Sequence, residues 1–268
     1  MLKRIATTLT ACALALPAGA ATQTVDETIK VRPGGTVSLE LLEGQVHFIG
    51  WDRSEVWIAG VVEVSGHRGD DDSDELIDIS SDGVDVDIEI EYARHGRNYR
   101  RGATELEIHV PYKTAIDAET VSADISVEGA RGEVSIESVN GDIRVEGEPR
   151  EVELGSVNGN IDLKSAAPVR SGHFESVSGN MDLSLELASN ARISMESVNG
   201  NIVLRLSDDV SAEFAIETFS GSIENELGPQ ARKTSQYLPA KTLEFSLGAG
   251  GARVIGESFN GRIELLRQ

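Results

Sequence analysis

The chain has 268 residues, a formal net charge of −21 at pH 7, one cysteine and only 4% aromatic residues. Such acidity argues against DNA, RNA or an anionic lipid surface as a partner, because each of them would be repelled. A single cysteine excludes an internal disulfide, and the low aromatic content disfavours sugar binding by ring stacking.

The first twenty residues have the pattern of a cleaved secretory signal peptide. Met1-Leu2-Lys3-Arg4 is basic, residues 5–16 are apolar, and Ala18-Gly19-Ala20 fits a signal peptidase site. The apolar run is too short to span a bilayer. We therefore expect an exported protein, periplasmic or extracellular. Leu9-Thr10-Ala11-Cys12 also matches a lipoprotein signal, so a lipid anchor on Cys12 is the alternative to simple cleavage.

Residues 21–115 alternate between strand patterns and polar turns. Apolar residues at every second position predict strands over 36–41, 46–49, 55–64, 76–80, 84–91 and 104–111. Residues 67–75 form a mostly acidic loop, which lacks the spaced ligands of an EF-hand, so we interpret it as a solvated loop and not a calcium site. We interpret residues 21–115 as divergent N-terminal coils of the repeat architecture that follows.

From residue 116 the chain is organised by a seven-residue motif, seen most clearly as Glu137-Ser138-Val139-Asn140-Gly141-Asp142-Ile143. The turn glycines of its copies, with Ala123 in a degenerate first copy, are separated by 18, 18, 20, 21, 21 and 40 residues. A period of about 20 residues is typical of a solenoid, in which each unit buries its apolar face only by stacking on its neighbours. Within a unit the apolar and charged residues alternate, which indicates short strands.

Two all-β folds are compatible with this pattern. Asn-Gly between alternating runs is a strong hairpin signal, which would give a β-meander. Hairpins do not require the same residue types at every turn, whereas stacking does, so the repetition favours a solenoid. We predict a single-stranded right-handed parallel β-helix, that is, a β-solenoid with coils of about 20 residues, whose regular repeats span residues 116–268.

Stacked coils place equivalent side chains in contact about 4.8 Å apart. The motif therefore predicts a Val/Phe ladder, an Ile/Met ladder, and a turn ladder in which side-chain amides hydrogen-bond along the stack. The turn ladder comprises Asn140, Gly141, Asn158, Gly159, Ser178, Gly179, Asn199, Gly200, Ser220, Gly221, Asn260 and Gly261.

The last 48 residues break the period. The doubled step between Gly221 and Gly261 predicts one coil that lacks the motif and carries an excursion. Gly228–Pro239 is basic and irregular, which makes it a candidate contact loop, with simple length variation as the alternative. The last coil, Arg262 to Arg267, is expected at the open end of the stack, where its edge could pair with a second copy.

Catalytic signals are weak throughout the sequence. It has no nucleophile elbow, zinc-protease, phosphate-loop or Cys/His metal pattern, so we expect no enzyme activity, cofactor or metal centre. Weak divalent-cation binding along the recurring acids is a minor hypothesis, and we expect Trp51 to cap the core. The recurring acids are Glu137, Glu175, Glu196, Glu217 and Glu257, and the histidines are His47, His67, His95, His109 and His173.

Four features together resemble one known family: Gly50-Trp51-Asp52, Val110-Pro111, the serial turns, and Leu247-Gly248-Ala249-Gly250 before the last motif. The family is the bacterial putative-adhesin group of β-strand-repeat domains of unknown function, related to the head domains called GIN. The resemblance covers about residues 24–268. It implies a parallel β-helix and an exported location, and it brings no active-site residues.

We therefore expect a non-enzymatic, adhesin-like interaction protein of the cell envelope, whose partner is an envelope protein or glycan. The alternatives are a carbohydrate-active enzyme on the same scaffold and a periplasmic sensor or regulatory partner. The enzyme alternative requires histidine and carboxylate side chains to converge in one groove.

Overall fold

The computed structural model describes residues 20–65, 76–90, 104–234 and 239–268. Over these residues the chain forms seventeen strands and no helix, which confirms the all-β class. Four predicted features lie outside the described residues: the signal peptide up to residue 19 with Cys12, the acidic loop, the histidines at 67 and 95, and the tip of the contact loop at 235–238.

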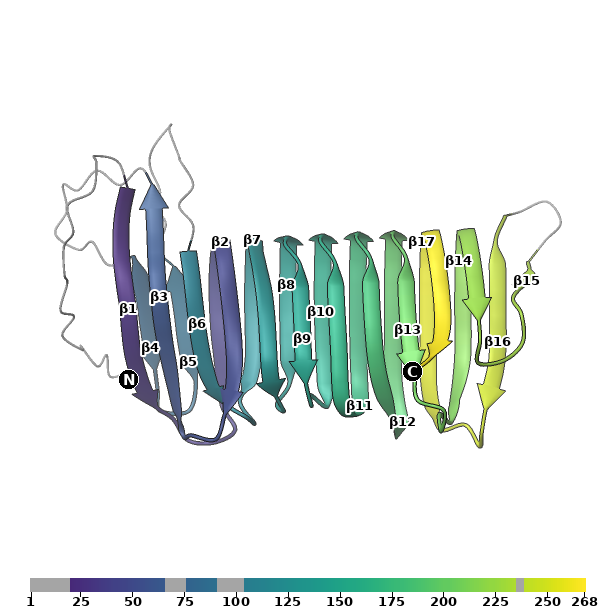
Figure 1. Ribbon diagram of the computed structural model, residues 1–268, viewed down its shortest axis with the longest axis horizontal. Helices are drawn as coiled ribbons and strands as arrows, with labels where there is room; N and C mark the ends of the chain where they lie inside the picture. Colours follow the sequence, from purple (N-terminus) through teal and green to yellow (C-terminus); the bar gives the residue numbers. More distant parts are fainter. Residues whose placement is uncertain (1–19, 66–75, 91–103, 235–238) are drawn as a thin grey trace.

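The central coils stack side by side into an elongated rod (Figure 1). Their strands are β7 (Ala115–Ala130), β8 (Val134–Asn140), β9 (Ile143–Gly147), β10 (Glu151–Asn158), β11 (Ile161–Ser178), β12 (Met181–Asn199) and β13 (Ile202–Leu206). The first half of each coil, before the turn glycine, pairs in parallel and in register with the first halves of its neighbours. The second halves pair with each other in the same way. Each coil therefore contributes one strand segment to each of two rows.

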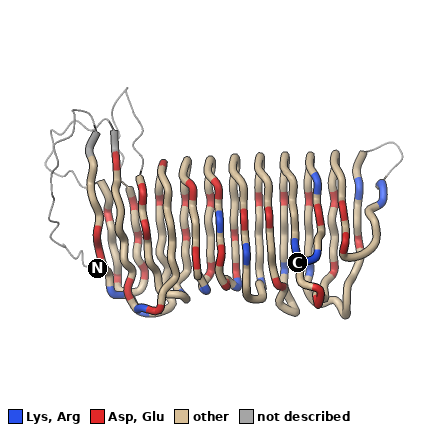
Figure 2. The backbone as a smooth tube through the Cα atoms, in the orientation of Figure 1, with Lys and Arg blue, Asp and Glu red and all other residues tan. Residues whose placement is uncertain are grey.

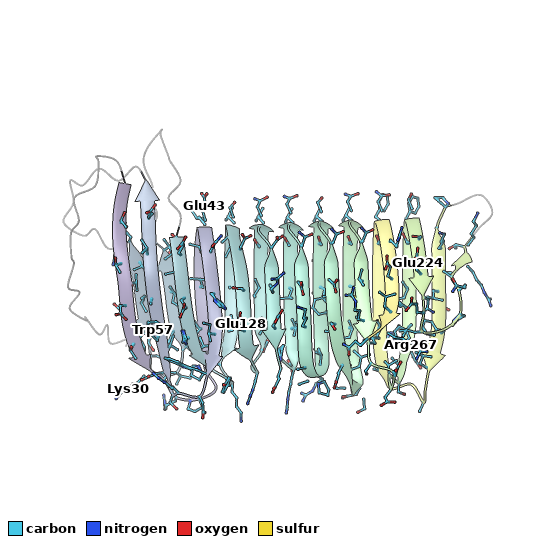
Figure 3. The ribbon with its side chains drawn as sticks, viewed as in Figure 1. Lys30, Glu43, Trp57, Glu128, Glu224 and Arg267 are labelled. Carbon is cyan, nitrogen blue, oxygen red and sulfur yellow. The ribbon has the colours of Figure 1, made fainter. Side chains whose placement is uncertain are left out.

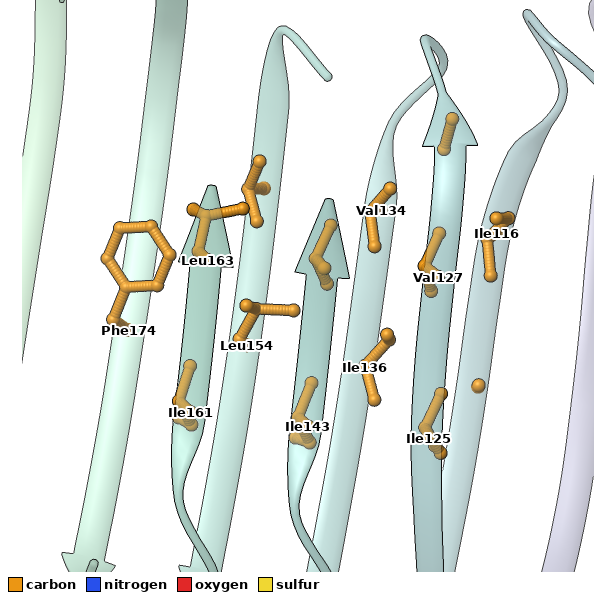
Figure 4. Packing of buried hydrophobic residues seen from close by; sticks show 14 of the residues in the cluster. Ile116, Ile125, Val127, Val134, Ile136, Ile143, Leu154, Ile161, Leu163 and Phe174 are labelled. Atoms are coloured by element: carbon orange, nitrogen blue, oxygen red, sulfur yellow. The ribbon is translucent and has the colours of Figure 1, made fainter. Parts of the chain in front are cut away.

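Alternating side chains from both rows meet in one continuous core. The Ile/Met ladder lies inside it, with Ile143, Ile161 and Met181 each 0–1% exposed and directly opposed in register. Ile136 and Leu154 enter the core from the other half of the coil (Figure 4). Because the alternation has a period of two, the intervening side chains of each segment are outside the core.

At the N-terminal end of the rod, the pairing between neighbouring strands changes from parallel to antiparallel. The strands of this end are β1 (Ala20–Lys30), β2 (Thr36–Trp51), β3 (Glu55–Ser65), β4 (Ile77–Ser81), β5 (Val86–Ile90) and β6 (Thr104–Pro111). β2 is a full coil that pairs in parallel with β7 on one side and with β5 and β6 on the other. Beyond these strands the pairing is antiparallel, β4 on β5 and β3 on β6, with β1 on β3.

The C-terminal end contradicts two predictions. Its strands are β14 (Ala212–Asn225), β15 (Arg232–Lys233), β16 (Lys241–Leu247) and β17 (Ala252–Arg267). The last coil, β17, has β12 and β13 on one side and β14 on the other. It pairs in parallel with all three strands. It is therefore not the exposed end of the stack. The excursion is no coil either, because β16 adds antiparallel to β14 and so covers the edge of that coil's first half.

Candidate functional site

The turn glycines line up along one long edge of the rod, where adjacent turns approach closely. A Cβ built on Gly159 would lie 2.0 Å from the carbonyl oxygen of Gly141, and one on Gly200 would lie 1.8 Å from that of Gly179. At Gly159 and Gly200, only a residue without a Cβ fits this spacing. The predicted turn positions lie at this edge in stack order as Asn140 and Gly141, Asn158 and Gly159, Ser178 and Gly179, Asn199 and Gly200, Asn260 and Gly261, and Ser220 and Gly221.

Amide hydrogen bonds join some of these turns. The Asn158 side chain donates to Asn140 Oδ1 at 3.0 Å, and that of Asn260 donates to Asn199 Oδ1 at 3.2 Å. Ser178 and Ser220 interrupt this row, because their hydroxyls are shorter than an amide. Such bonds are local to each pair of asparagines.

A more continuous row lies at the residue after the glycine, and the sequence reasoning missed it. Each side-chain oxygen accepts the backbone N–H of the equivalent residue on the next coil, from Asp124 to Asp142 at 2.9 Å and onward to Asn160 at 2.8 Å. The same bond continues through the next coils to the last one, where Asn201 accepts from Arg262. The sequence contains a signal for this row, because the residue after the turn glycine is Asp or Asn in every coil that donates such a bond except the last, which has Arg262.

The outward side of the first half-coils forms what we call the groove face. Along β8, Ile136 and Ser138 point inward, so Glu137 and Val139 point outward. The predicted Val/Phe ladder lies here, at the surface and not in the core. The six predicted members are joined by Leu42 and Val121 of the neighbouring coils, and the eight side chains have exposed fractions of 40–52%: Leu42, Val121, Val139, Val157, Val177, Val198, Phe259 and Phe219. We call this set the apolar row; its last two rings stack with centroids 4.9 Å apart.

Beside the apolar row runs a line of glutamates, which we call the Glu row. The strand register places acids directly opposite one another on consecutive coils, with Gly155 at the one position that lacks an acid. In stack order the row is Glu89, Glu40, Glu119, Glu137, Glu175, Glu196, Glu257 and Glu217. Among the described residues, only Glu175 of this row forms an ion pair, with His173 at 2.7 Å. Apart from Glu175, the row therefore carries negative charge without ion-paired partners among the described residues. Arg192 and Arg253 lie on the same outward side, four residues before Glu196 and Glu257, and Lys241 lines the far end of the groove.

These two rows and their neighbours line an open groove with a volume of about 1430 Å³ that runs along the stack from β5 and β2 to β14 and β16. Thr234, Lys241 and Thr242 close its far end. Thr234 belongs to the predicted contact loop, so the base of that loop lies at the end of the groove. Acidic residues occur along the whole rod (Figure 2), and turn residues such as Glu43 project from its upper edge (Figure 3).

The outward side of the second half-coils differs in its charges. Here cations and anions alternate between neighbouring coils: Lys164 lies 2.8 Å from Glu146, and Arg144 lies 3.6 Å from Asp162. Arg205 pairs with Asp182 further along the stack. The hydrogen bond from Lys164 lowers the pKa of Glu146, and the same bond raises the pKa of Lys164. This face, which we call the paired face, is electrostatically compensated.

The three described histidines are divided between the outward sides of the two half-coils. Of the described histidines, His47 and His109 lie on the second half-coils near Glu128 and Glu107, and only His173 lines the groove.

The prediction that Trp51 caps the core is wrong. Its ring is half-buried on the outer surface, under the Arg53 guanidinium, because the alternation that buries Val46 and Phe48 points Trp51 outward. No group of three or more metal-ligating side chains occurs within the described ranges.

A family model described as Toastrack DUF4097 matches residues 77–244 of this chain. No curated protein sequence is significantly similar to this chain. In the described part of the chain, no helix is long and apolar enough to cross a membrane.

Three solved structures are similar in overall arrangement. A "putative adhesin" from Bacteroides fragilis is 12% identical with a TM-score of 0.46, covering 91% of this chain and 97% of that one. A "putative cell adhesion protein" from Clostridium sporogenes is 12% identical with a TM-score of 0.32, covering 92% and 100%. A "putative lipid binding protein" from Parabacteroides distasonis is 11% identical with a TM-score of 0.37, covering 93% and 97%.

Proposed function

The chain belongs to the Toastrack DUF4097 family, a family of domains of unknown function, and we propose that it is an exported, non-enzymatic interaction protein of the cell envelope that holds an elongated partner on its groove face. The single observation that carries this proposal is the groove itself. It repeats the same two outward side-chain types, acidic and apolar, on nearly every coil over the length of the stack. A catalytic centre needs one set of converging groups, whereas a repeated surface suits an extended contact.

Stability does not require either repeated row. Exposed valines and phenylalanines contribute little to a core, and directly opposed like charges on neighbouring strands are destabilising. Both rows are nevertheless repeated along the groove. A binding role for the face gives a reason for side chains that the fold itself does not need.

Two further parts of the proposal rest on the sequence. Export rests on the signal-peptide pattern of residues 1–20, and a nucleic acid partner is disfavoured by the net charge of −21. The scaffold, in this proposal, is a right-handed parallel β-helix within residues 116–268, interrupted by the antiparallel excursion that contains β15 and β16, and it is supported by the in-register parallel pairing of the central coils. The antiparallel strands at both ends are then caps on that helix.

Site-specific photo-crosslinking in the native cells tests the function. A photoreactive amino acid replaces Val177 at the centre of the groove, and in a matched control it replaces Arg144 on the paired face. Both sites are solvent-exposed, so neither change should unfold the chain. We expect a crosslinked envelope species from the Val177 position and none from the Arg144 position. Equal products at both positions, or none at either, would contradict a groove-specific partner.

A further inference from the structure

The groove offers charge and apolar surface with a fixed repeat. Neighbouring strands lie about 4.8 Å apart, so the Glu row presents one carboxylate about every 4.8 Å along the stack. The row contains two unbroken stretches of four acids, separated by Gly155, and the one at the C-terminal end consists of Glu175, Glu196, Glu257 and Glu217. Seven of the eight acids lack an ion pair among the described residues. A ligand that fits must bring several positive charges in a line.

The apolar row adds a second requirement. It runs parallel to the Glu row, because on each strand the apolar residue follows the acid by two positions, as Val139 follows Glu137. Its side chains are 40–52% exposed. Val177 and Val198 flank the same carboxylates that form the C-terminal stretch, and Phe259 and Phe219 continue this surface as stacked rings. A fitting ligand therefore also carries aliphatic segments between its charges, because hydrated inorganic cations would leave this surface unused.

The repeat distance distinguishes between candidate ligands. Ammonium groups joined by three methylenes lie about 5 Å apart at standard bond lengths, which matches the coil spacing. Side chains on one face of an extended peptide repeat about every 6.8 Å, so a basic peptide lying along the groove would lose register by about 2 Å at each coil. A calcium ion needs about six to eight converging oxygens, and the described residues hold no such group.

We propose that the groove binds a linear aliphatic polyamine, with its ammonium groups on successive glutamates and its methylenes against the apolar row. The inference uses the same face as the proposed function and adds a ligand class to it. A polyamine bound there neutralises the Glu row from one coil to the next.

Titration calorimetry on the purified protein tests the ligand class. The probes are a trimethylene-linked tetraamine, the corresponding diamine, and Mg²⁺. Because linked charges bind with high effective concentration, we expect the tetraamine to bind at least about tenfold more tightly than the diamine. Raising the salt concentration should weaken binding, since exposed charges are screened. Absence of tetraamine binding at millimolar concentration, or equal affinity for Mg²⁺, overturns the proposal.

Three variants locate the site. The double variant Glu196→Gln/Glu257→Gln should lower tetraamine affinity about tenfold or more, because it removes two linked contacts. Glu186→Gln/Asp209→Asn removes two exposed acids outside the groove and should leave affinity unchanged. Gly155→Glu should raise affinity, because it fills the missing position and its Cβ would meet only Glu137 Cγ at 3.8 Å. Equal losses in both double variants would show non-specific charge attraction and overturn the proposal.

The two proposals fail separately. Crosslinking at Val177 without tetraamine binding leaves the interaction function standing and removes the polyamine. Tetraamine binding without any crosslinked species keeps the polyamine site and removes the macromolecular partner.

Discussion

The groove face and the paired face are built from the same coils, yet they treat charge in opposite ways. On the paired face, Lys164 and Glu146 neutralise each other across neighbouring coils at 2.8 Å. On the groove face, Glu196 and Glu257 are directly opposed and carry no partner among the described residues. The paired face shows that this fold can compensate its surface charge. The uncompensated row therefore indicates a use outside folding.

The inner and outer sides of one strand should differ most in their contribution to stability. Phe174 is fully buried, whereas Val177, three residues later on β11, is 44% exposed. We expect Phe174→Ala to lower the free energy of unfolding by about 3–5 kcal/mol through lost burial and a cavity. Val177→Ala should change it by no more than about 0.5 kcal/mol. Urea denaturation of both variants measures the contrast.

A large loss in Val177→Ala would break the comparison. It would show that the apolar row stabilises the stack, and only the Glu row would then indicate a binding face.

The edge where the turn glycines of adjacent coils pack closely should give the next largest effect on the free energy of unfolding. Gly200→Ala places a Cβ 1.8 Å from the carbonyl oxygen of Gly179, so two coils must separate locally. We expect a loss of about 1–3 kcal/mol, as for other overpacked sites. Gly155→Ala is the matched control, because its Cβ would meet no atom closer than 3.8 Å. Thermal unfolding that gives the same shift for both variants would contradict close packing at the turns.

The sequence predicted the strands, the turns and the stacking, because these follow from local alternation and from the repeat. It failed on which coil is neighbour to which. Each coil carries the same motif, so Ile263 fits beside Ile202 or beside Ile223 equally well, and it pairs with both. β17 lies between the coil of β12 and β13 and that of β14, while β16 covers the other side of β14, and no local sequence pattern encodes this order.

Part of the groove could have been predicted from the sequence. The alternation that buries Ile136 and Ser138 places Glu137 and Val139 together on the outer side, so both rows could have been assigned to one face. The lack of ion pairs along the Glu row could not be predicted, because it depends on which coils are adjacent and on which side chains they bring opposite one another.

Removing charge from the groove face should stabilise the protein slightly. In Glu196→Gln/Glu257→Gln, the repulsion between directly opposed carboxylates is relieved, and we expect a gain of about 0.2–1 kcal/mol at low salt. The gain should shrink as salt screens the row. Denaturation at two ionic strengths measures it. A loss of stability would mean that these acids have stabilising contacts and would remove the contrast with the paired face.

The smallest effect concerns the Lys164–Glu146 pair and its pH dependence. The hydrogen bond holds the pKa of Glu146 below its ordinary 4.5 and the pKa of Lys164 above its ordinary 10.5. A lowered carboxyl pKa stabilises the fold above its ordinary value, and this contribution is lost as the pH falls through the lowered pKa. A raised amine pKa stabilises the fold below its ordinary value, and this contribution is lost as the pH rises through the raised pKa.

Lys164→Gln should therefore be slightly less stable than the parent protein between about pH 4.5 and 10.5. The difference should disappear as the pH falls through the lowered pKa of Glu146 and as it rises through the raised pKa of Lys164. Both side chains are solvent-exposed, so the difference is small and requires paired denaturation curves across this range. Glu146→Gln should follow the same profile, because each variant removes the same bond. A difference that persists at low pH would show that Lys164 acts through its methylene packing, and the paired face would then owe its stability to contacts other than charge.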